Sequence, residues 1–135
     1  MVENGFHATT AGISVDVSVF YVDNQSQPEH GRYVWAYHVK ISNATPEPVQ
    51  LISRTWRITD GQGQMMLVEG EGVVGQQPVL EPGGTFEYSS GTPLPTPSGF
   101  MTGTYHMLRP QTGEQFDIAI PVFSLDSPYQ NTRIH

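Results

Sequence analysis

The sequence predicts an all-β fold, a sandwich of two antiparallel sheets with about seven or eight strands. Apolar and polar residues alternate over residues 13–22 and again over 33–41, and a period of two is typical of strands with one buried face. The 14 Gly and 11 Pro residues fall largely between the apolar stretches, where they mark turns. No stretch shows a sustained helical period, so short strands separated by turns favour a sandwich.

The first half of the chain divides into strands at clear turn signals. Trp35 lies among aromatic residues on one face of its strand and is expected to fill the space between the sheets. Two prolines within residues 42–48 end that strand, and the sequence Asp-Gly-Gln-Gly at 60–63 predicts a tight hairpin turn. The strands expected here cover residues 13–22, 33–41, 49–60 and 64–69.

The second half of the chain contains three further expected strands after a segment dominated by Gly and Pro at 70–84. The Pro-rich segment 91–99 is expected to cross between the sheets, with Leu94 in the core. Pro121 donates no ladder hydrogen bond, so the last strand should lie at a sheet edge or carry a bulge there. These strands cover residues 85–90, 100–108 and 115–125.

The 135 residues are the length of one domain, which we assign to residues 1–126, with a loosely held tail at 127–135. The first 12 residues contain neither a basic stretch nor an apolar run, so no signal peptide and a cytoplasmic location are expected. Asn43-Ala44-Thr45 matches a glycosylation acceptor, which means little without a secretion signal. The absence of cysteine excludes disulfides, a thiolate nucleophile and sulfur-ligated zinc.

The charge balance disfavours polyanionic partners. Six Lys and Arg residues against 13 Asp and Glu residues give a formal net charge of −7. Binding to a nucleic acid or to an anionic membrane depends on clustered cations, and the cations here are scattered singly. We therefore expect no nucleic-acid partner and no membrane partner.

The sequence GEGVVG at residues 70–75 has the glycine spacing of a nucleotide-binding loop, but its context does not fit. Such loops hold phosphates because they open a helix, whose first N–H groups face the ligand. Pro78 and Pro82 follow closely, and each would cost about 3 kcal/mol or more inside a helix. Glu69 and Glu71 add negative charge. We expect a turn in which glycine supplies positive φ angles.

Longer segments of the chain resemble the ApaG family. The resemblance is carried by VEGEGVVGQQPVLEPG at residues 68–83 and FEYSSGTPLPTPSGFMTGTYHM at 86–107, and extends over about residues 6–125. It implies a sandwich of the fibronectin type III or immunoglobulin kind. In such a sandwich, Tyr105 would form a tyrosine corner, with its hydroxyl bonded to a backbone group. The family has been associated with cobalt and magnesium homeostasis and with dinucleotide metabolism, and it has no established catalytic residues.

Arg54 has the same strand parity as the apolar residues Ile52, Trp56 and Ile58. A guanidinium at such a position must be paired or must reach the rim of the core. We expect an ion pair with Glu69 or Glu71 that fixes the Gly-rich loop. A binding spot for an anion or a partner is the alternative.

The Gly-rich loop is also the expected partner-contact segment, because loops at the ends of sandwiches often carry recognition. The residues assigned to it are Glu69, Gly70, Glu71, Gly72 and Gly75.

Catalytic and metal-binding signals are weak. No nucleophile elbow and no zinc-protease helix motif is present. None of the five histidines pairs with another at metal-ligand spacing, although His38 or His106 could meet a carboxylate. We assign no catalytic residue, cofactor or metal.

The sequence leaves two main hypotheses and one weaker hypothesis for the function. The first is a non-enzymatic module that docks an unidentified protein through the Gly-rich loop or a sheet edge. The second is a protein that binds a small ligand or a divalent cation, and an enzyme ranks last. A homodimer is reasonable, because unprotected edge strands can pair.

Overall fold

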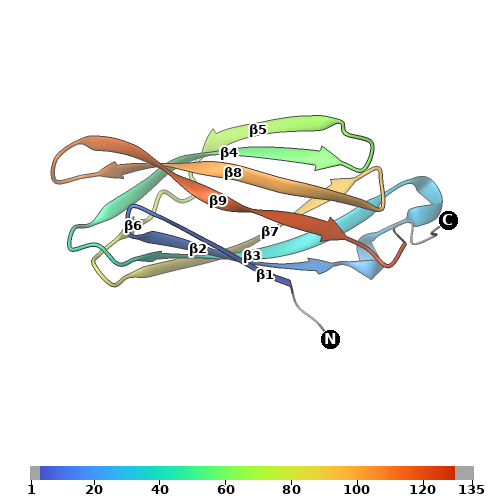
Figure 1. The fold of residues 1–135 in the computed structure, drawn as a ribbon, viewed down its shortest axis with the longest axis horizontal. Coiled ribbons are helices and arrows are strands. Elements are labelled where there is room, and N and C mark those ends of the chain that lie inside the picture. The colour runs from blue at the N-terminus through green and yellow to red at the C-terminus, as the bar shows by residue number, and fades with distance from the viewer. Residues whose placement is uncertain (1–3, 130–135) are drawn as a thin grey trace.

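A computed structural model describes residues 4–129, which form nine strands in two facing antiparallel sheets (Figure 1). The expected all-β sandwich is confirmed, with nine strands in place of seven or eight. The first sheet has the order β1-β2-β3-β7, with bounds Asn4–Thr10, Ile13–Tyr21, Tyr33–Asn43 and Thr85–Leu94. The second has the order β5-β4-β8-β9, with bounds Met65–Glu71, Val49–Asp60, Ser98–Arg109 and Glu114–Asp126, and β6 (Val79–Leu80) pairs with β4.

Sequence alternation failed to predict β1 and β6. β1 is rich in polar and small residues, yet it pairs with β2 along its whole length. β6 has only two residues, too few for any periodic signal. The polar link before β3 forms two short 3₁₀ turns, Asp23–Gln25 and Pro28–His30. No helix within residues 4–129 has the length and apolar character needed to cross a membrane.

The buried faces of β2 and β3 follow the expected period of two. Val15, Val17 and Val19 of β2 are buried, and so are Trp35 and Val39 of β3. The expected role of Trp35 is confirmed, because it is buried and its indole N–H reaches the other sheet, where it donates to the carbonyl oxygen of Asp126 at 2.9 Å. Apolar burial of this kind stabilises by about 25 cal/mol per Å².

The Pro-rich segment differs from its expected form. β7 continues through Gly91 to Leu94, and β8 begins at Ser98, so residues 95–97 alone make the crossover between the sheets. Pro93 is tolerated in a strand because β7 is the last strand of its sheet. The expected burial of Leu94 is confirmed.

Pro121 lies in an edge strand and at a bulge, as the chemistry of proline predicts. β9 is the edge strand of its sheet, and the pairing register between β8 and β9 shifts between Met101 and Gly103. Those two residues face Phe123 and Ile120, so Pro121 and Val122 form an irregularity in the ladder. The missing N–H of the proline therefore breaks no regular ladder.

The expected tyrosine corner is wrong. Tyr105 is fully buried between the sheets, and its hydroxyl bonds to the hydroxyl of Tyr88 on the opposite sheet rather than to backbone. The difference arises because β7 places a second tyrosine opposite Tyr105, within reach of its hydroxyl.

The start of the expected tail packs against the sandwich. Ser127 is buried and donates to the carbonyl oxygen of Pro97 at 2.7 Å, and the ring of Tyr129 lies 6.2 Å from that of Tyr21. Residues 130–135 of that tail lie outside the described residues.

Asn43 ties three segments together at one end of the sandwich. Its side chain is buried, and its amide nitrogen donates to the carbonyl oxygens of Glu47 and Leu80 at 2.9 and 3.0 Å. Its amide oxygen accepts from the backbone N–H and the hydroxyl of Thr45. The asparagine that matched a glycosylation acceptor is thus a structural junction between β3, the following turn and β6.

Replacing Asn43 with Ala should lower the free energy of unfolding by about 2–4 kcal/mol, because buried carbonyl groups lose their donors. Urea denaturation measures this loss. Ser42→Ala, on the opposite face of the same strand, is the matched control and should stay within about 0.5 kcal/mol of the parent. Equal stability of both variants would contradict a junction at Asn43.

Candidate functional site

The sandwich is closed along one side and open along the other. On the closed side, β1 packs against β9: the rings of Phe6 and Phe123 lie 5.8 Å apart, and the Ala119 N–H donates to the Thr10 hydroxyl at 3.2 Å. On the open side, β5 and β7 are the last strands of their sheets. Inner-face residues of both sheets are therefore left accessible between β5 and β7.

A cleft of about 380 Å³ occupies this open side. Its walls are mainly apolar, with Met66 and Val68 from β5 on one side and the β7 segment 90–93 on the other. Trp56, Ile58 and Met101 are also part of its lining. Ligand-binding sites are typically concave and mainly apolar, with a few polar groups, so this cleft is the candidate functional site.

Arg54 lies in the cleft wall, half-buried, and holds the Gly-rich loop. Its Nη1 donates to the carbonyl oxygens of Glu71 and Gly72 at 3.2 and 2.6 Å. The expected ion pair with Glu69 or Glu71 is wrong, because these residues pair in register with Thr55 and Ser53 and so share the outer face of the sheet. Arg54 pairs with Gly70, whose missing side chain leaves room for the guanidinium.

The Gly-rich loop is a turn and not the start of a helix. Gly72 has a φ of 63°, and Val73 and Gln76 form an isolated bridge that closes the turn. The chain then runs extended into β6, so the expected absence of a phosphate-binding helix after Gly75 is confirmed. Of the predicted contact residues, Glu69, Glu71 and Gly75 are exposed, whereas Gly72 is buried and Gly70 lies beneath Arg54.

Two tyrosines are among the polar residues of the cleft. Tyr37 and Tyr88 line it, and Tyr105 lies behind Tyr88 as its hydrogen-bond partner. Burial raises the pKa of all three hydroxyls above the usual value, and the nearby Arg54 charge opposes this only partly. These groups therefore stay protonated to a higher pH than an exposed tyrosine does.

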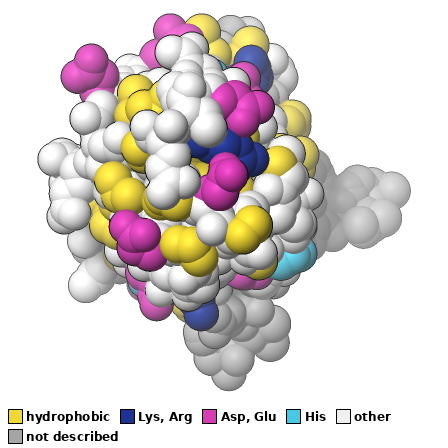
Figure 2. Space-filling view, turned by 90° about the vertical axis from the view of Figure 1, so that its left-hand side faces the viewer, with side chains coloured by type: hydrophobic (Ala, Val, Ile, Leu, Met, Phe, Trp, Pro, Cys, Tyr) yellow, Lys and Arg dark blue, Asp and Glu magenta, His cyan; other side chains and the backbone are white. Residues whose placement is uncertain are grey.

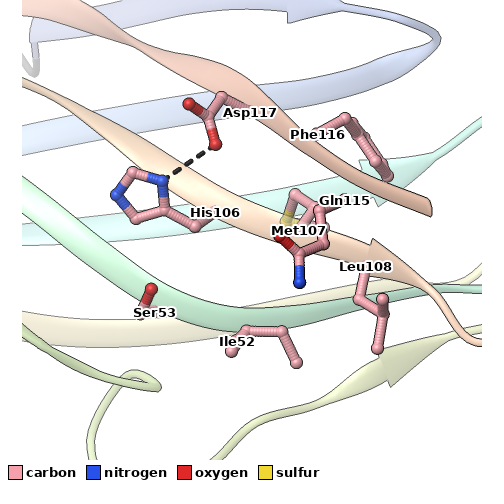
Figure 3. A pocket seen from close by; sticks show the side chains of 8 residues that line it. All are labelled: Ile52, Ser53, His106, Met107, Leu108, Gln115, Phe116 and Asp117. Carbon is pink, nitrogen blue, oxygen red and sulfur yellow. Dashed lines mark hydrogen bonds and ion pairs between the residues drawn. The ribbon is translucent and has the colours of Figure 1, made fainter. Parts of the chain in front are cut away.

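A second hollow, of about 390 Å³, lies over β4, β8 and β9 (Figure 3). His106 faces it and bonds through Nδ1 to Asp117 and through Nε2 to the Thr55 hydroxyl, both at 2.8 Å. This is the order of a hydroxyl–His–carboxylate triad. Thr55, however, is 7% exposed and lies mid-sheet, where the ladders on both sides use the backbone amides that an oxyanion hole would need.

His7 and His38 form similar cross-strand trios, His7 with Asp16 and Thr9, and His38 with Glu87 and Ser89. Each is a single histidine and a single carboxylate. Across residues 4–129, no three His, Asp or Glu side chains come together in a way that could hold a metal ion. His38 and His106 therefore each meet a carboxylate, but neither gains a third ligand.

Arg109 is an arginine of this protein whose charge is paired with carboxylates. Figure 2 faces the end of the sandwich at the left of Figure 1, and basic atoms there lie among acidic ones. Arg109 donates from Nε to Glu114 at 2.9 Å, lies 3.8 Å from Glu47, and covers the ring of Phe116 at 4.5 Å. Its charge is neutralised, whereas Arg54 has no carboxylate partner within the described part of the chain.

Sequence reasoning missed the exposed apolar residues around the open side. Met65, Met66 and Leu67 of β5 are 59, 50 and 53% exposed, and Val74 of the loop is 56% exposed. The unbroken apolar run MMLV on a hairpin arm was the sequence signal that could have identified them. A strand with one solvated face normally alternates apolar and polar residues.

Replacing Arg54 with Met should lower the free energy of unfolding by about 1–3 kcal/mol, because two loop carbonyl groups lose a charged donor. Arg57→Met is the control: Arg57 lies on the same strand, is exposed, and should change stability by no more than about 0.5 kcal/mol. Chemical denaturation compares the two, and an Arg54 variant as stable as its control would refute the loop-fixing role.

The buried tyrosines should make the fold sensitive to alkali. An unfolded tyrosine ionises near pH 10, whereas the raised pKa values keep Tyr37, Tyr88 and Tyr105 protonated in the folded state. The unfolding free energy should be unaffected by these groups below about pH 10 and fall above it by about 1.4 kcal/mol per pH unit for each tyrosine. Tyr88→Phe should flatten that slope, and an unchanged slope would argue against the assignment.

Comparisons with known proteins agree with the resemblance noted in the sequence. A family model described as the ApaG domain matches residues 23–109. The proteins named ApaG from Rhodospirillum centenum and Paramagnetospirillum magneticum are 56 and 54% identical to the chain; the alignments cover 95 and 96% of this chain and 98 and 99% of theirs. A solved structure described as an ApaA protein from Bordetella pertussis superposes with a TM-score of 0.83 at 50% identity, covering 87% of this chain and 95% of its own. The chain therefore belongs to the ApaG domain family.

Proposed function

We propose that the protein is a non-enzymatic interaction module that binds an extended segment of a partner protein along the free edge of β5. The observation that carries this proposal is the open side of the sandwich, where an apolar cleft lies directly beside an unpaired edge strand. Strand addition suits such a site, because the edge supplies backbone hydrogen bonds and the cleft accepts alternate side chains.

The edge of β5 is better suited to strand addition than the edge of β7. Pro93 interrupts the donors of β7, and proline is one of the devices that protect a free edge. β5 contains no Pro and no Lys, and Met65, Met66 and Leu67 make its first half apolar and exposed, whereas Glu69 and Glu71 make its second half acidic. Methionine adapts its shape to different partners, which favours a recognition surface.

The Gly-rich loop borders the same site. Val74 lines the cleft, and Arg54 fixes the turn that follows β5. A strand added to β5 would therefore meet the loop at one end, in keeping with the partner-contact role expected for residues 69–75. It would cover the open side much as β1 and β9 cover the other.

Neighbouring residues of β5 offer a matched test. Met66 faces the cleft and Leu67 the outer side of the sheet, with nearly equal exposure of 50 and 53%. A phage-displayed library of random peptides of about ten residues, the upper length of common strands, is selected on the wild-type protein. Enriched peptides should alternate apolar residues, and Met66→Lys should weaken their binding about tenfold or more, measured by fluorescence anisotropy.

Leu67→Lys is the control and should alter the affinity by less than about twofold. Three results would contradict the proposal: no enriched peptide, equal loss in both variants, or a stable dimer of the protein that itself occupies β5. Sedimentation of the free protein detects the third.

A further inference from the structure

Arg54 uses only part of its hydrogen-bonding capacity. A guanidinium has five N–H donors in a fixed fork. In this structure Nη1 makes both observed bonds, to the carbonyl oxygens of Glu71 and Gly72. Among residues 4–129, no acceptor bonds to Nε or Nη2, and the guanidinium lines the cleft.

Within residues 4–129, no carboxylate lines the cleft or pairs with that cation. Although the net charge is −7, Glu69 and Glu71 on the neighbouring strand belong to the outer face of the sheet. A half-buried cation without a counter-charge is costly, because it loses hydration without gaining an ion pair. Among residues 4–129, the guanidinium is bonded to backbone carbonyl oxygens alone, which leaves its remaining N–H groups available to an anionic ligand.

The other polar groups in the cleft favour the same kind of ligand. Tyr37, Tyr88 and Ser90 line it beside Arg54, and the Tyr88 hydroxyl already bonds to that of Tyr105. Tyrosine hydroxyls, whose usual pKa is about 10, are protonated at neutral pH, and burial raises the pKa of Tyr37 and Tyr88 further. A guanidinium in a cleft that also contains hydroxyl-bearing residues is complementary to a carboxylate, which accepts paired bonds from the guanidinium fork.

Building on the proposed function, we infer that the segment bound at β5 carries a carboxylate that pairs with Arg54 inside the cleft. A single guanidinium matches the single charge of a carboxylate. A phosphate group carries close to two charges and is usually held by several cations or by a helix N-terminus. The carboxylate belongs either to an Asp or Glu side chain or to the C-terminus of the partner chain.

The test changes the ligand first, so that the folding of the protein is not in question. Peptides selected on the wild-type protein are remade with Asn or Gln in place of each Asp or Glu, and separately with an amidated C-terminus. One of these changes should weaken binding about tenfold or more, and which one does so identifies the source of the carboxylate. Inorganic phosphate, added as competitor, should leave the affinity unchanged.

Protein variants then locate the pairing group. Arg54→Gln should weaken binding of the acidic peptide by about tenfold or more yet have little further effect on the neutral peptide, as expected for coupled groups. Thermal unfolding of each variant confirms that it is folded. Peptides that respond to Met66→Lys but not to removal of their carboxylates would overturn this inference and leave the proposed function intact. If no peptide binds at all, both fail.

Discussion

The open side of this sandwich depends on one interaction, the hydrogen bonding of Arg54 to the backbone of the Gly-rich loop. Nη1 of Arg54 bonds to the carbonyl oxygens of Glu71 and Gly72, and the guanidinium rests against Gly70. Because Gly70 has no side chain, the arginine can lie across the inner face of β5. This contact sets where β5 ends and where the chain turns back toward β6, and so sets the shape of the cleft.

The asymmetry between the two sides of the fold follows from strand order. β1 and β9 close one side through aromatic packing and a hydrogen bond. On the other side, β5 belongs to a hairpin with β4 and receives no cover from β7, so its inner residues Met66 and Val68 line an open cleft. Trp56 lines that cleft and is buried, and Tyr105 lies behind the lining residue Tyr88, to which it is hydrogen-bonded.

Much of the fold could be predicted because burial on one face imposes a period of two on the sequence. β2 and β3 were identified in this way, and Pro121 indicated the edge position of β9. β1 was missed because its residues are mostly small or polar and it is held by pairing with β2. The extension of β7 to Leu94 was missed because proline signals a turn unless the strand is known to lie at an edge.

The candidate site was only partly predictable. The parity of Arg54 correctly singled it out as a cation on the inner face, but the partner depended on pairing register, and a shift of one residue moves every side chain to the other face. Gly70 therefore meets the guanidinium, and the two glutamates face outward. The cleft itself depends on which strands end each sheet, and local sequence does not contain that information.

The most direct measurement of the central claim is amide hydrogen exchange with and without a bound peptide from the selected library. If a partner segment adds to β5 and enters the cleft, the amides of Met65–Glu71 should exchange more slowly in the complex, and the turn at 72–76 should be slowed with them. The account is contradicted if the slowed amides lie on β7 or over the hollow between β8 and β9 while β5 is unchanged.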